Sequence, residues 1–542
     1  MLLPSLHADP FTRQNLPPLE QWPVLLPLGL DYPPQLNAVD ALLDTHVRRG
    51  WGDRVALRGP GLCWTYAQLQ TQVDQIAWVL KHDWSLPTGS RVLLRGANHP
   101  MLAACWLAVL KAGCVAVTTM PLLRSRELGV IADKAQVNAA LCEATLMAEW
   151  QSAVSDRGLP CPTLSYGPRG ELESAMSRHK QPFACAATSQ DDVALIAFTS
   201  GTTGVPKGTM HFHRDLLLIA DVLAQHMLAP GPDDVFMGTP PLAFTFGLGG
   251  LLVFPLRVGA SAVLYPQFTP QTLLEGMVQH QATICFTAPT FYRKMASLAP
   301  GLDLRSLRHA VSSGEMLPAD TREQWRQATG LELTECLGST EMLHAFIASR
   351  PGEVRAGATG VVVPGYVACV LDDHGQPVPT GQVGRLAVRG PTGCRYLNDA
   401  RQTQYVQDGW NLTGDAYLRD ADGYFWYQSR TDDMIISAGY NIAGPEVEEV
   451  LLTHPSVAEC GVVGAPDPER GQVVTAFVVL RPNAQDQAEL TQALQDWVKQ
   501  ALAPYKYPRR VHFVAELPRT ENAKLQRFVL RQWAAQRPFT AM

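Results

Sequence analysis

The chain contains 542 residues, of which 46% are hydrophobic and 17% are charged, and its formal net charge is −6. At about 150 residues per domain, this length predicts more than one domain, and the acidic balance argues against a nucleic-acid surface, which needs clustered Lys and Arg. The most apolar window, 101–117, is interrupted by Lys111 and Gly113, so it falls short of the ~20 apolar residues of a membrane span. We expect a buried helix followed by a strand there.

The eleven cysteines show no Cys-x-x-Cys spacing. Several of them, including Cys105, Cys142 and Cys285, lie in apolar segments, which is typical of reduced core thiols rather than disulfides or zinc ligands. The first ten residues have neither the basic segment nor the apolar core of a secretory signal. We therefore expect a cytoplasmic protein that binds neither membranes nor nucleic acid.

Strands and helices are predicted to alternate from residue 91 onward. The strands are predicted over 91–95, 115–118 and 139–142, and the helices over 101–111 and 124–134. Thr269 and Pro270 predict the start of a further helix that runs to His280, and a strand is expected over 283–287. Repeated units of this kind are typical of a mostly parallel sheet covered by helices. We predict one large α/β body up to about residue 430.

The pattern changes after this point. An aromatic strand is predicted over 423–427, a polar break follows at 431–433, and a helix begins after Gly444 and Pro445. The first turn of that helix is expected to carry the carboxylates of Glu446, Glu448 and Glu449. A polar loop over 483–487 precedes another helix that ends near Leu502. We therefore predict an N-terminal domain over 1–431 and a small α+β domain over 432–542, joined by a hinge at Asp432.

The segment Phe198–Gly208 reads Phe-Thr-Ser-Gly-Thr-Thr-Gly-Val-Pro-Lys-Gly and directly follows an apolar strand. Glycines let a backbone approach an anion closely, hydroxyls can donate to phosphate oxygens, and Lys207 adds a positive charge. Pro206 before the lysine and Gly208 after it exclude a Walker A motif. The segment predicts a nucleotide-phosphate loop, and a Gly/Thr loop without a ligand is the alternative.

This loop resembles the signature of the adenylate-forming superfamily, which contains acyl-CoA synthetases, peptide-synthetase adenylation domains and luciferases. Further motifs of the superfamily follow in order at 338–341, 413–415, 429–433, 439–442 and 518–527. The resemblance covers about 35 to 535 and is closest to benzoate-CoA and 2-aminobenzoate-CoA ligases. It implies a large ATP- and acid-binding N-terminal domain, a mobile C-terminal domain, and formation of an acyl-AMP from a carboxylic acid and ATP, followed by transfer to a thiol. ATP, Mg²⁺ and coenzyme A are the cofactors that it implies.

The resemblance also implies residue roles. Glu341 would hold Mg²⁺, Lys524 would bridge the carboxylate and the α-phosphate, and Thr203 and Lys207 would complete the catalytic set. The nucleotide and CoA contacts would be Thr199, Ser200, Gly201, Thr202, Gly204, Ser313, Gly314, Glu315, Glu335, Cys336, Leu337, Gly338, Ser339, Thr340, Asp415, Arg430, Gly439 and Tyr440. Taken alone, Glu341 reads as a capping carboxylate and Lys524 as an exposed tail lysine. Two residues depart from the family pattern: Ala523 stands where glycine is usual, and Leu337 where many relatives carry an aromatic residue.

The acid is predicted from the segment 242–250, Leu-Ala-Phe-Thr-Phe-Gly-Leu-Gly-Gly, whose rings and glycines suit a flat ligand. It carries no acidic residue for the ammonium group of an amino acid. We predict an aromatic acid that contacts Phe244, Thr245, Phe246, His344 and Ala345. His344 as a satisfied core histidine is the alternative. His211 and His213 have no third ligand at a recognisable spacing for a metal site, which favours structural or nucleotide-adjacent roles.

Three functions remain open from the sequence. The first is an aryl-CoA ligase for benzoate or 2-aminobenzoate. The second is an adenylating ligase for a small aliphatic or amino acid, and the third is a catalytically silent nucleotide-binding homologue. Glu341 and Lys524 disfavour the silent protein. The ring substituents, the identity of the acceptor thiol and a homodimeric state stay open.

Overall fold

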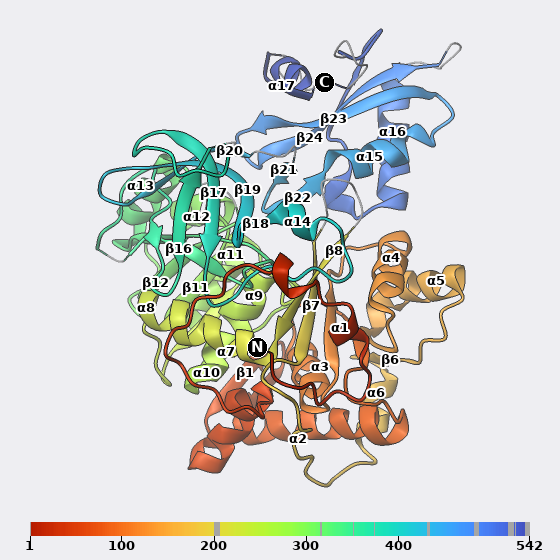
Figure 1. Cartoon of the computed structure of the whole chain (residues 1–542), viewed down its shortest axis with the longest axis vertical. Helices are drawn as coiled ribbons and strands as arrows, with labels where there is room; N and C mark the ends of the chain where they lie inside the picture. Colours follow the sequence, from red (N-terminus) through yellow and green to blue (C-terminus); the bar gives the residue numbers. More distant parts are fainter. Residues whose placement is uncertain are drawn as a thin grey trace. The chain divides into compact units, whose positions relative to one another are not determined.

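The computed structural model describes residues 2–199, 206–314, 317–350, 352–372, 374–430, 434–481, 487–518, 525 and 527–536. The chain forms two compact units, which Figure 1 colours along the sequence. Unit 1 consists of Met1–Pro121, Ala132–Phe198 and Gly208–Ser429, and unit 2 consists of Leu122–Ile131, Thr199–Lys207 and Arg430–Met542. The last division falls two residues before the predicted boundary at 431/432, and the predicted hinge Asp432 lies outside the described residues.

The first sheet of unit 1 has six strands in the order β6-β5-β3-β4-β7-β8. Its strands are β3 (Arg91–Arg95), β4 (Val115–Thr119), β5 (Ala139–Glu143), β6 (Thr163–Tyr166), β7 (Val193–Thr199) and β8 (Lys207–Phe212). The helices that precede or connect these strands in the chain are α2 (Tyr66–Trp78), α3 (Pro100–Lys111), α4 (Ser125–Ala135), α5 (Met147–Arg157) and α6 (Glu171–Met176). Most of α4 belongs to unit 2. The strands from β6 to β7 are parallel, so the predicted alternation is confirmed with small shifts at the ends.

Helix α3 explains the apolar window in the sequence. All of its residues from Pro100 to Lys111 are buried, as expected for a helix that is hydrophobic on every side. The Lys111 ammonium at its end donates to Asp44 at 2.8 Å and to Asp74 at 2.5 Å. These two carboxylates compensate a charge that burial alone would make costly. Among the described residues, no helix is long and apolar enough to cross a membrane.

The second sheet of unit 1 has nine strands in the order β15-β14-β13-β12-β11-β9-β10-β1-β2. They are β1 (Val55–Gly59), β2 (Leu62–Thr65), β9 (Val235–Gly238), β10 (Ser261–Val263), β11 (Ile284–Thr287), β12 (His309–Ser312), β13 (Leu333–Gly338), β14 (Ala345–Ala348) and β15 (Val361–Val362). The strands from β13 to β1 are parallel, and β2, β14 and β15 are antiparallel. At this antiparallel end of the sheet, the turn between β13 and β14 carries Glu341.

Helices flank this sheet. They are α7 (His213–Ile219), α8 (Gln225–Met227), α9 (Thr245–Leu248), the π-helix η7 (Gly249–Val253), α10 (Phe254–Val258), α11 (Pro270–His280), α12 (Pro289–Leu298) and α13 (Ala319–Thr329), and a short α1 (Phe11–Gln14) lies near the N-terminus. Helix α11 begins and ends as predicted, because the Thr269 side chain caps its first turn and Pro270 occupies the first helical position.

The remaining strands of unit 1 form an antiparallel sheet in the order β16-β17-β19-β18, with β20 paired to β19. Its elements are β16 (Val367–Leu371), β17 (Val383–Arg389), α14 (Gln402–Tyr405), β18 (Val406–Gln407), β19 (Trp410–Arg419) and β20 (Phe425–Arg430). Strand β20 overlaps the predicted aromatic strand but starts two residues later and continues to Arg430. The predicted ATP-loop strand β7 and the carboxylate-bearing strand β19 thus belong to different sheets.

Unit 2 contains a five-stranded sheet in the order β22-β21-β24-β23, with β25 paired to β24. Its elements are β21 (Met434–Ser437), β22 (Tyr440–Ala443), α15 (Gly444–Leu452), β23 (Val457–Asp467), β24 (Gly471–Leu480), α16 (Gln487–Ala501), β25 (Arg510–Phe513) and α17 (Arg527–Gln536). The prediction of three first-turn carboxylates in α15 is wrong for two of them, because only Glu446 lies there. The Glu448 side chain instead accepts from the Val462 backbone N–H at 2.6 Å and pairs with Arg527.

Candidate active site

Glu341 lies in the turn between β13 and β14, where its side chain is 6% exposed. The Tyr396 hydroxyl donates a hydrogen bond of 2.5 Å to Oε1 of this carboxylate. Burial raises the pKa of Tyr396 well above its ordinary value, and the negative charge of Glu341 raises it further. The tyrosine therefore stays protonated and holds one carboxylate oxygen, which is what a fixed ligand for a hard cation requires.

Tyr405 packs beside Tyr396, the tyrosine that holds Glu341. Its ring packs edge-on against Tyr396 with 5.8 Å between the ring centres, and its hydroxyl lies 3.3 Å from Oγ of Ser339. Burial raises the pKa of Tyr405 well above its ordinary value, and the charges of Glu341 and Asp415 raise it further. Glu341 and Asp415 thus both act electrostatically on Tyr405, and both belong to unit 1.

Asp415 is positioned by a local distortion of β19. Gly414 before it has a φ of +80°, a conformation that L side chains rarely adopt. The Asp415 backbone N–H donates to Oγ1 of Thr413 at 3.2 Å, and the Asp415 side chain is 7% exposed. The Thr-Gly-Asp sequence therefore has a structural reason, since the glycine allows the turn that presents the aspartate.

His211 supports the turn that carries Glu341. Its Nε2 donates to the Thr340 carbonyl at 2.8 Å, and burial lowers the pKa of this imidazole to about 4. Behind it, the buried carboxylate of Asp215 pairs with Arg395, whose guanidinium lies 4.1 Å from the centre of the Phe212 ring. A neutral histidine thus fixes the backbone directly next to Glu341, which agrees with the structural role predicted from the sequence.

We expect Tyr396→Phe to weaken the site without removing it. The substitution deletes the hydroxyl that holds Oε1 of Glu341 and keeps the ring that packs on Tyr405. The resemblance implies that Glu341 holds Mg²⁺, and loss of an outer-shell partner of a metal ligand typically costs 10- to 100-fold in metal affinity or activity. The Mg²⁺ concentration for half-maximal pyrophosphate release should therefore rise by about 10- to 100-fold. An unchanged Mg²⁺ dependence, measured at saturating ATP, would contradict this role.

Aromatic rings surround His344, which follows the turn and precedes β14. The centres of the Phe254, Phe246 and Phe286 rings lie 4.7, 5.7 and 6.5 Å from the centre of its imidazole ring. His344 is 3% exposed, and burial lowers its pKa to about 4, so its ring is neutral. A side chain on Gly249 would collide with the imidazole, which explains why a glycine faces it. The rings and the glycine form one apolar cluster.

Only one of the two ring nitrogens of His344 has a hydrogen-bond partner in the described part of the chain. Its Nε2 lies 3.4 Å from the Phe246 carbonyl oxygen, a long hydrogen bond. Its Nδ1 is buried and has no hydrogen-bond partner in the described part of the chain. Buried polar atoms without a partner are uncommon in native proteins and call for an explanation. Other buried histidines, among them His211 and His213, also have one ring nitrogen without a partner in the described part of the chain, so the substrate role of His344 stays a prediction.

The other predicted substrate residues adjoin this cluster in the chain. Phe244 precedes α9, and Thr245, which begins α9, is 8% exposed. Ala345 is 3% exposed, begins β14 and pairs with Gly338 of β13. A Cβ on Gly338 would lie 2.7 Å from the His344 carbonyl oxygen, so the strands approach closely at this point.

Two predicted nucleotide contacts, Glu335 and Cys336, have buried side chains. The Glu335 carboxylate is buried and pairs with Arg322 at 3.0 Å, and burial raises its pKa to about 7. Burial also raises the pKa of the Cys336 thiol to about 12, while its backbone carbonyl accepts from Oγ of Ser313 at 2.7 Å. The backbone N–H and carbonyl of Glu335 are also hydrogen-bonded, to Ser349. Leu337 is half-buried next to them, and Gly314 follows Ser313 with a φ of +93°.

The structure does not describe every predicted site residue. Outside the described residues lie Ser200, Gly201, Thr202, Thr203, Gly204, Glu315, Asp432 and Lys524. Assigned to unit 2 are Thr199, Lys207, Arg430, Gly439 and Tyr440. Within that unit the Tyr440 ring stacks on Tyr505 with 4.1 Å between the ring centres. The roles of these residues therefore stay predictions.

Comparison with known proteins identifies the family. The model of AMP-binding enzymes matches residues 43–396, and that of the AMP-binding enzyme C-terminal domain matches 446–524. The chain belongs to the AMP-binding, adenylate-forming enzymes. This family membership confirms the resemblance and the α/β fold predicted from the motifs, and it implies ATP, CoA and a carboxylic acid as ligands.

Within this family the similar proteins include ligases for aromatic acids. Benzoate–CoA ligase of Thauera aromatica is 34% identical over 520 residues, which is 93% of this chain and 97% of that protein. The anthranilate CoA ligase AuaEII, solved with anthranoyl-AMP, is 32% identical with a TM-score of 0.71 and covers 93% of this chain and 98% of its own. The amide bond synthetase McbA of Marinactinospora thermotolerans is 30% identical with a TM-score of 0.83, over 92% and 100% of the two chains. The protein is therefore an adenylate-forming acyl-CoA ligase of the AMP-forming acid–thiol class.

Proposed function

We propose that this ligase activates an aromatic carboxylic acid of the benzoate or 2-aminobenzoate type as its acyl-AMP and then forms the CoA thioester. The observation that carries the proposal is the apolar cluster of Phe246, Phe254, Phe286 and His344 beside Gly249. Flat rings and an absent side chain suit a planar aryl group. The named aryl-CoA ligases among the relatives support the same substrate class.

An ortho-amino group is favoured by the unpartnered nitrogen of His344. If Nε2–H donates to the Phe246 carbonyl, Nδ1 of the neutral ring is an acceptor. An aryl amine or hydroxyl can donate to that nitrogen, whereas unsubstituted benzoate leaves it unpaired. A buried unpaired acceptor costs about 1–3 kcal/mol, which would give 2-aminobenzoate the advantage. The Thr245 hydroxyl is a second acceptor for the same amine.

The first half-reaction joins two anions. A carboxylate oxygen attacks the α-phosphorus, a carbon–oxygen–phosphorus linkage forms, and pyrophosphate leaves. Positive charge must offset the repulsion between carboxylate and phosphate, and Lys524 and Lys207 are the cations proposed for this task. In the second half-reaction the CoA sulfur attacks the acyl carbon and AMP leaves.

The residues around Glu341 fit a magnesium–nucleotide. Mg²⁺ prefers carboxylate and phosphate oxygens, and the buried Glu341 carboxylate is held by Tyr396 next to the backbone that His211 fixes. When bound, Mg²⁺ would neutralise phosphate charge. Asp415, presented by Gly414, is proposed to accept from the ribose hydroxyls.

An amine acceptor is the second candidate, because the amide bond synthetase McbA covers the same length of chain. In that case the acyl group would pass from the adenylate to an amine instead of to CoA.

The experiment that tests the proposal incubates the protein with ATP, Mg²⁺, 2-aminobenzoate and CoA and identifies the product by mass spectrometry. Formation of 2-aminobenzoyl-CoA supports the thioester, whereas 2-aminobenzoyl-AMP without thioester, converted to an amide by added amines, supports the second candidate.

We expect Ala345→Ile to change the choice between acids. Ala345 is buried next to His344 and opposite Gly338, so the added branched side chain would occupy room near the proposed ortho group. A few methylenes in an apolar pocket change discrimination by about 10- to 200-fold. The ratio of kcat/KM for 2-aminobenzoate to that for benzoate should fall by about this factor.

Two measurements make this test decisive. The thermal midpoint of Ala345→Ile shows whether the strand still folds, and Ala345→Val offers a smaller step with a correspondingly smaller fall in the ratio. An unchanged ratio in a folded variant would show that Ala345 does not limit the acid.

A further inference from the structure

Two histidines and an aspartate meet on the surface of unit 1, away from the residues of the candidate active site in the chain. His82 and Asp83 end the π-helix η4 (Val79–Asp83), and His179 follows α6. Their ligand atoms lie within 4.8 Å of one another. Because about a hundred residues of sequence separate them, the fold itself creates this cluster through the packing of α2 against α6.

Two of the distances within the cluster are close to those between the ligands of a metal ion. Nδ1 of His82 lies 3.2 Å from Oδ1 of Asp83, and Nε2 of His179 lies 3.0 Å from the same oxygen. Zinc–nitrogen and zinc–oxygen bonds of about 2.0–2.1 Å in a tetrahedron separate neighbouring ligand atoms by about 3.3–3.4 Å. The two imidazole nitrogens lie within 4.8 Å of each other, so a bound ion would draw them together while both stay next to Oδ1 of Asp83.

The surroundings hold these ligands in place. The Arg178 guanidinium donates to the other carboxylate oxygen, Oδ2 of Asp83, at 2.6 Å, which leaves Oδ1 directed to the imidazoles. The Trp78 indole stacks on His179 with 6.1 Å between the ring centres and contacts His82 edge-on at 6.3 Å. A partner on the second oxygen and a packed ring are the usual supports of metal-binding side chains.

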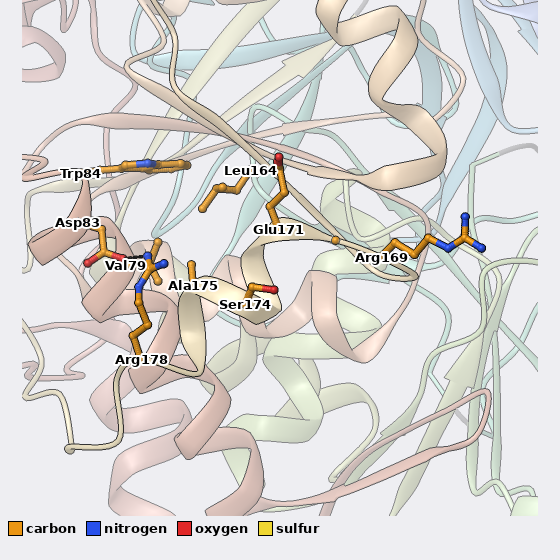
Figure 2. A pocket seen from close by; sticks show the side chains of 10 residues that line it. Val79, Asp83, Trp84, Leu164, Arg169, Glu171, Ser174, Ala175 and Arg178 are labelled. Atoms are coloured by element: carbon orange, nitrogen blue, oxygen red, sulfur yellow. Dashed lines mark hydrogen bonds and ion pairs between the residues drawn. The ribbon is translucent and has the colours of Figure 1, made fainter.

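An open hollow gives access to the aspartate. Asp83 and Arg178 lie side by side at one end of a cavity of about 440 Å³, which Trp84, Leu164 and Glu171 also line (Figure 2). The exposed fraction of the His82 side chain is 68%, so solvent reaches the cluster from this ligand as well. Three protein ligands with solvent access leave a coordination position for water.

A second group of three possible ligands, Asp40, Asp44 and Cys185, contains no imidazole. Its carboxylates pair with Arg48 and with the buried Lys111. Burial raises the pKa of the Cys185 thiol far above its ordinary value, and a metal binds the thiolate. This group serves as a comparison within the same chain.

We propose that His82, Asp83 and His179 form a binding site for one borderline divalent transition-metal ion, such as Zn²⁺, Ni²⁺ or Cu²⁺. Imidazole nitrogens select these ions over Mg²⁺, which prefers oxygen ligands. The bound ion would join the end of η4 to the segment after α6. This site is independent of the proposed acyl-CoA ligase chemistry.

The test is calorimetric titration of the full chain with zinc alone. We expect one zinc per chain at this site and at least about a 10-fold loss of its affinity in His82→Gln, Asp83→Asn and His179→Gln, since even outer-shell substitutions cost that much. His226→Gln, which removes an exposed histidine elsewhere, and Cys185→Ser should bind as the wild type does. Excess Mg²⁺ should not displace the zinc.

A second readout uses the neighbouring indole. Cu²⁺ at this site should quench the fluorescence of the nearby Trp78 and Trp84, and the quenching should be smaller in Trp78→Phe and lost in His179→Gln. Ligase activity should stay unchanged in His179→Gln, so a failure of this proposal is distinguishable from a failure of the proposed function. Absence of zinc binding to the wild type, or equal zinc affinity in the three ligand variants and the wild type, would overturn the site.

Discussion

Glu341→Gln should reduce kcat/KM for acid-dependent pyrophosphate release by about 10²- to 10³-fold, the loss typical of removing one preorganised electrostatic group. Glutamine has nearly the same shape, and its amide oxygen can still accept from the Tyr396 hydroxyl, so the fold should persist. The negative charge that would hold Mg²⁺ at the phosphates is lost. The defect should therefore be greatest at low Mg²⁺ and shrink as Mg²⁺ is raised.

The matched control is Glu353→Gln, the same substitution at an exposed glutamate. It should leave both the rate and its Mg²⁺ dependence unchanged. If Glu341→Gln instead keeps wild-type activity at low Mg²⁺, the carboxylate is a structural cap and the proposed metal role is wrong.

Lys524→Ala should lower the rate of adenylation by orders of magnitude while thioester formation from synthetic aryl-AMP stays close to that of the wild type. The reason is that a cation bridging carboxylate and α-phosphate is needed only while both anions are being joined. Lys524 lies outside the described residues, and its role rests on the motif at 518–527. Ala523 before it in place of the usual glycine limits the backbone but keeps the ammonium.

Separate assays of the two half-reactions check this expectation. Isotope exchange between pyrophosphate and ATP reports adenylation, and AMP release from synthetic aryl-AMP with CoA reports thioester formation. Lys294→Ala, which removes an exposed lysine, is the control and should affect neither assay. An equal loss in both assays would refute the bridging role of Lys524.

The regular elements were predictable because local signals agree with the packing. The strand over 91–95 has the bounds of β3, and the cap and proline at Thr269 and Pro270 define α11. Glu448 shows the limit of such reasoning. A carboxylate near a helix start suggests an interaction with the helix end, yet its partners Val462 and Arg527 come from β23 and α17.

The candidate site was only partly predictable, because the residues that support it come from distant parts of the sequence. Glu341 and Asp415 lie in recognisable motifs, but their support comes from Tyr396, Tyr405 and His211, which have no motif of their own. The family resemblance implied Glu335 as a nucleotide contact. Its side chain pairs with Arg322 of α13, a long-range partner that the strand sequence does not reveal, and its role toward a nucleotide stays a prediction.

Pyrophosphate release across a panel of carboxylic acids, with and without CoA, tests the central claim most directly. The panel contains 2-aminobenzoate, benzoate, a short aliphatic acid and an amino acid, each at the same concentration with ATP and Mg²⁺. We predict the highest kcat/KM for 2-aminobenzoate, a measurable but lower value for benzoate, and continuous turnover only when CoA is present. A preference for the short aliphatic acid or the amino acid would contradict the aryl assignment.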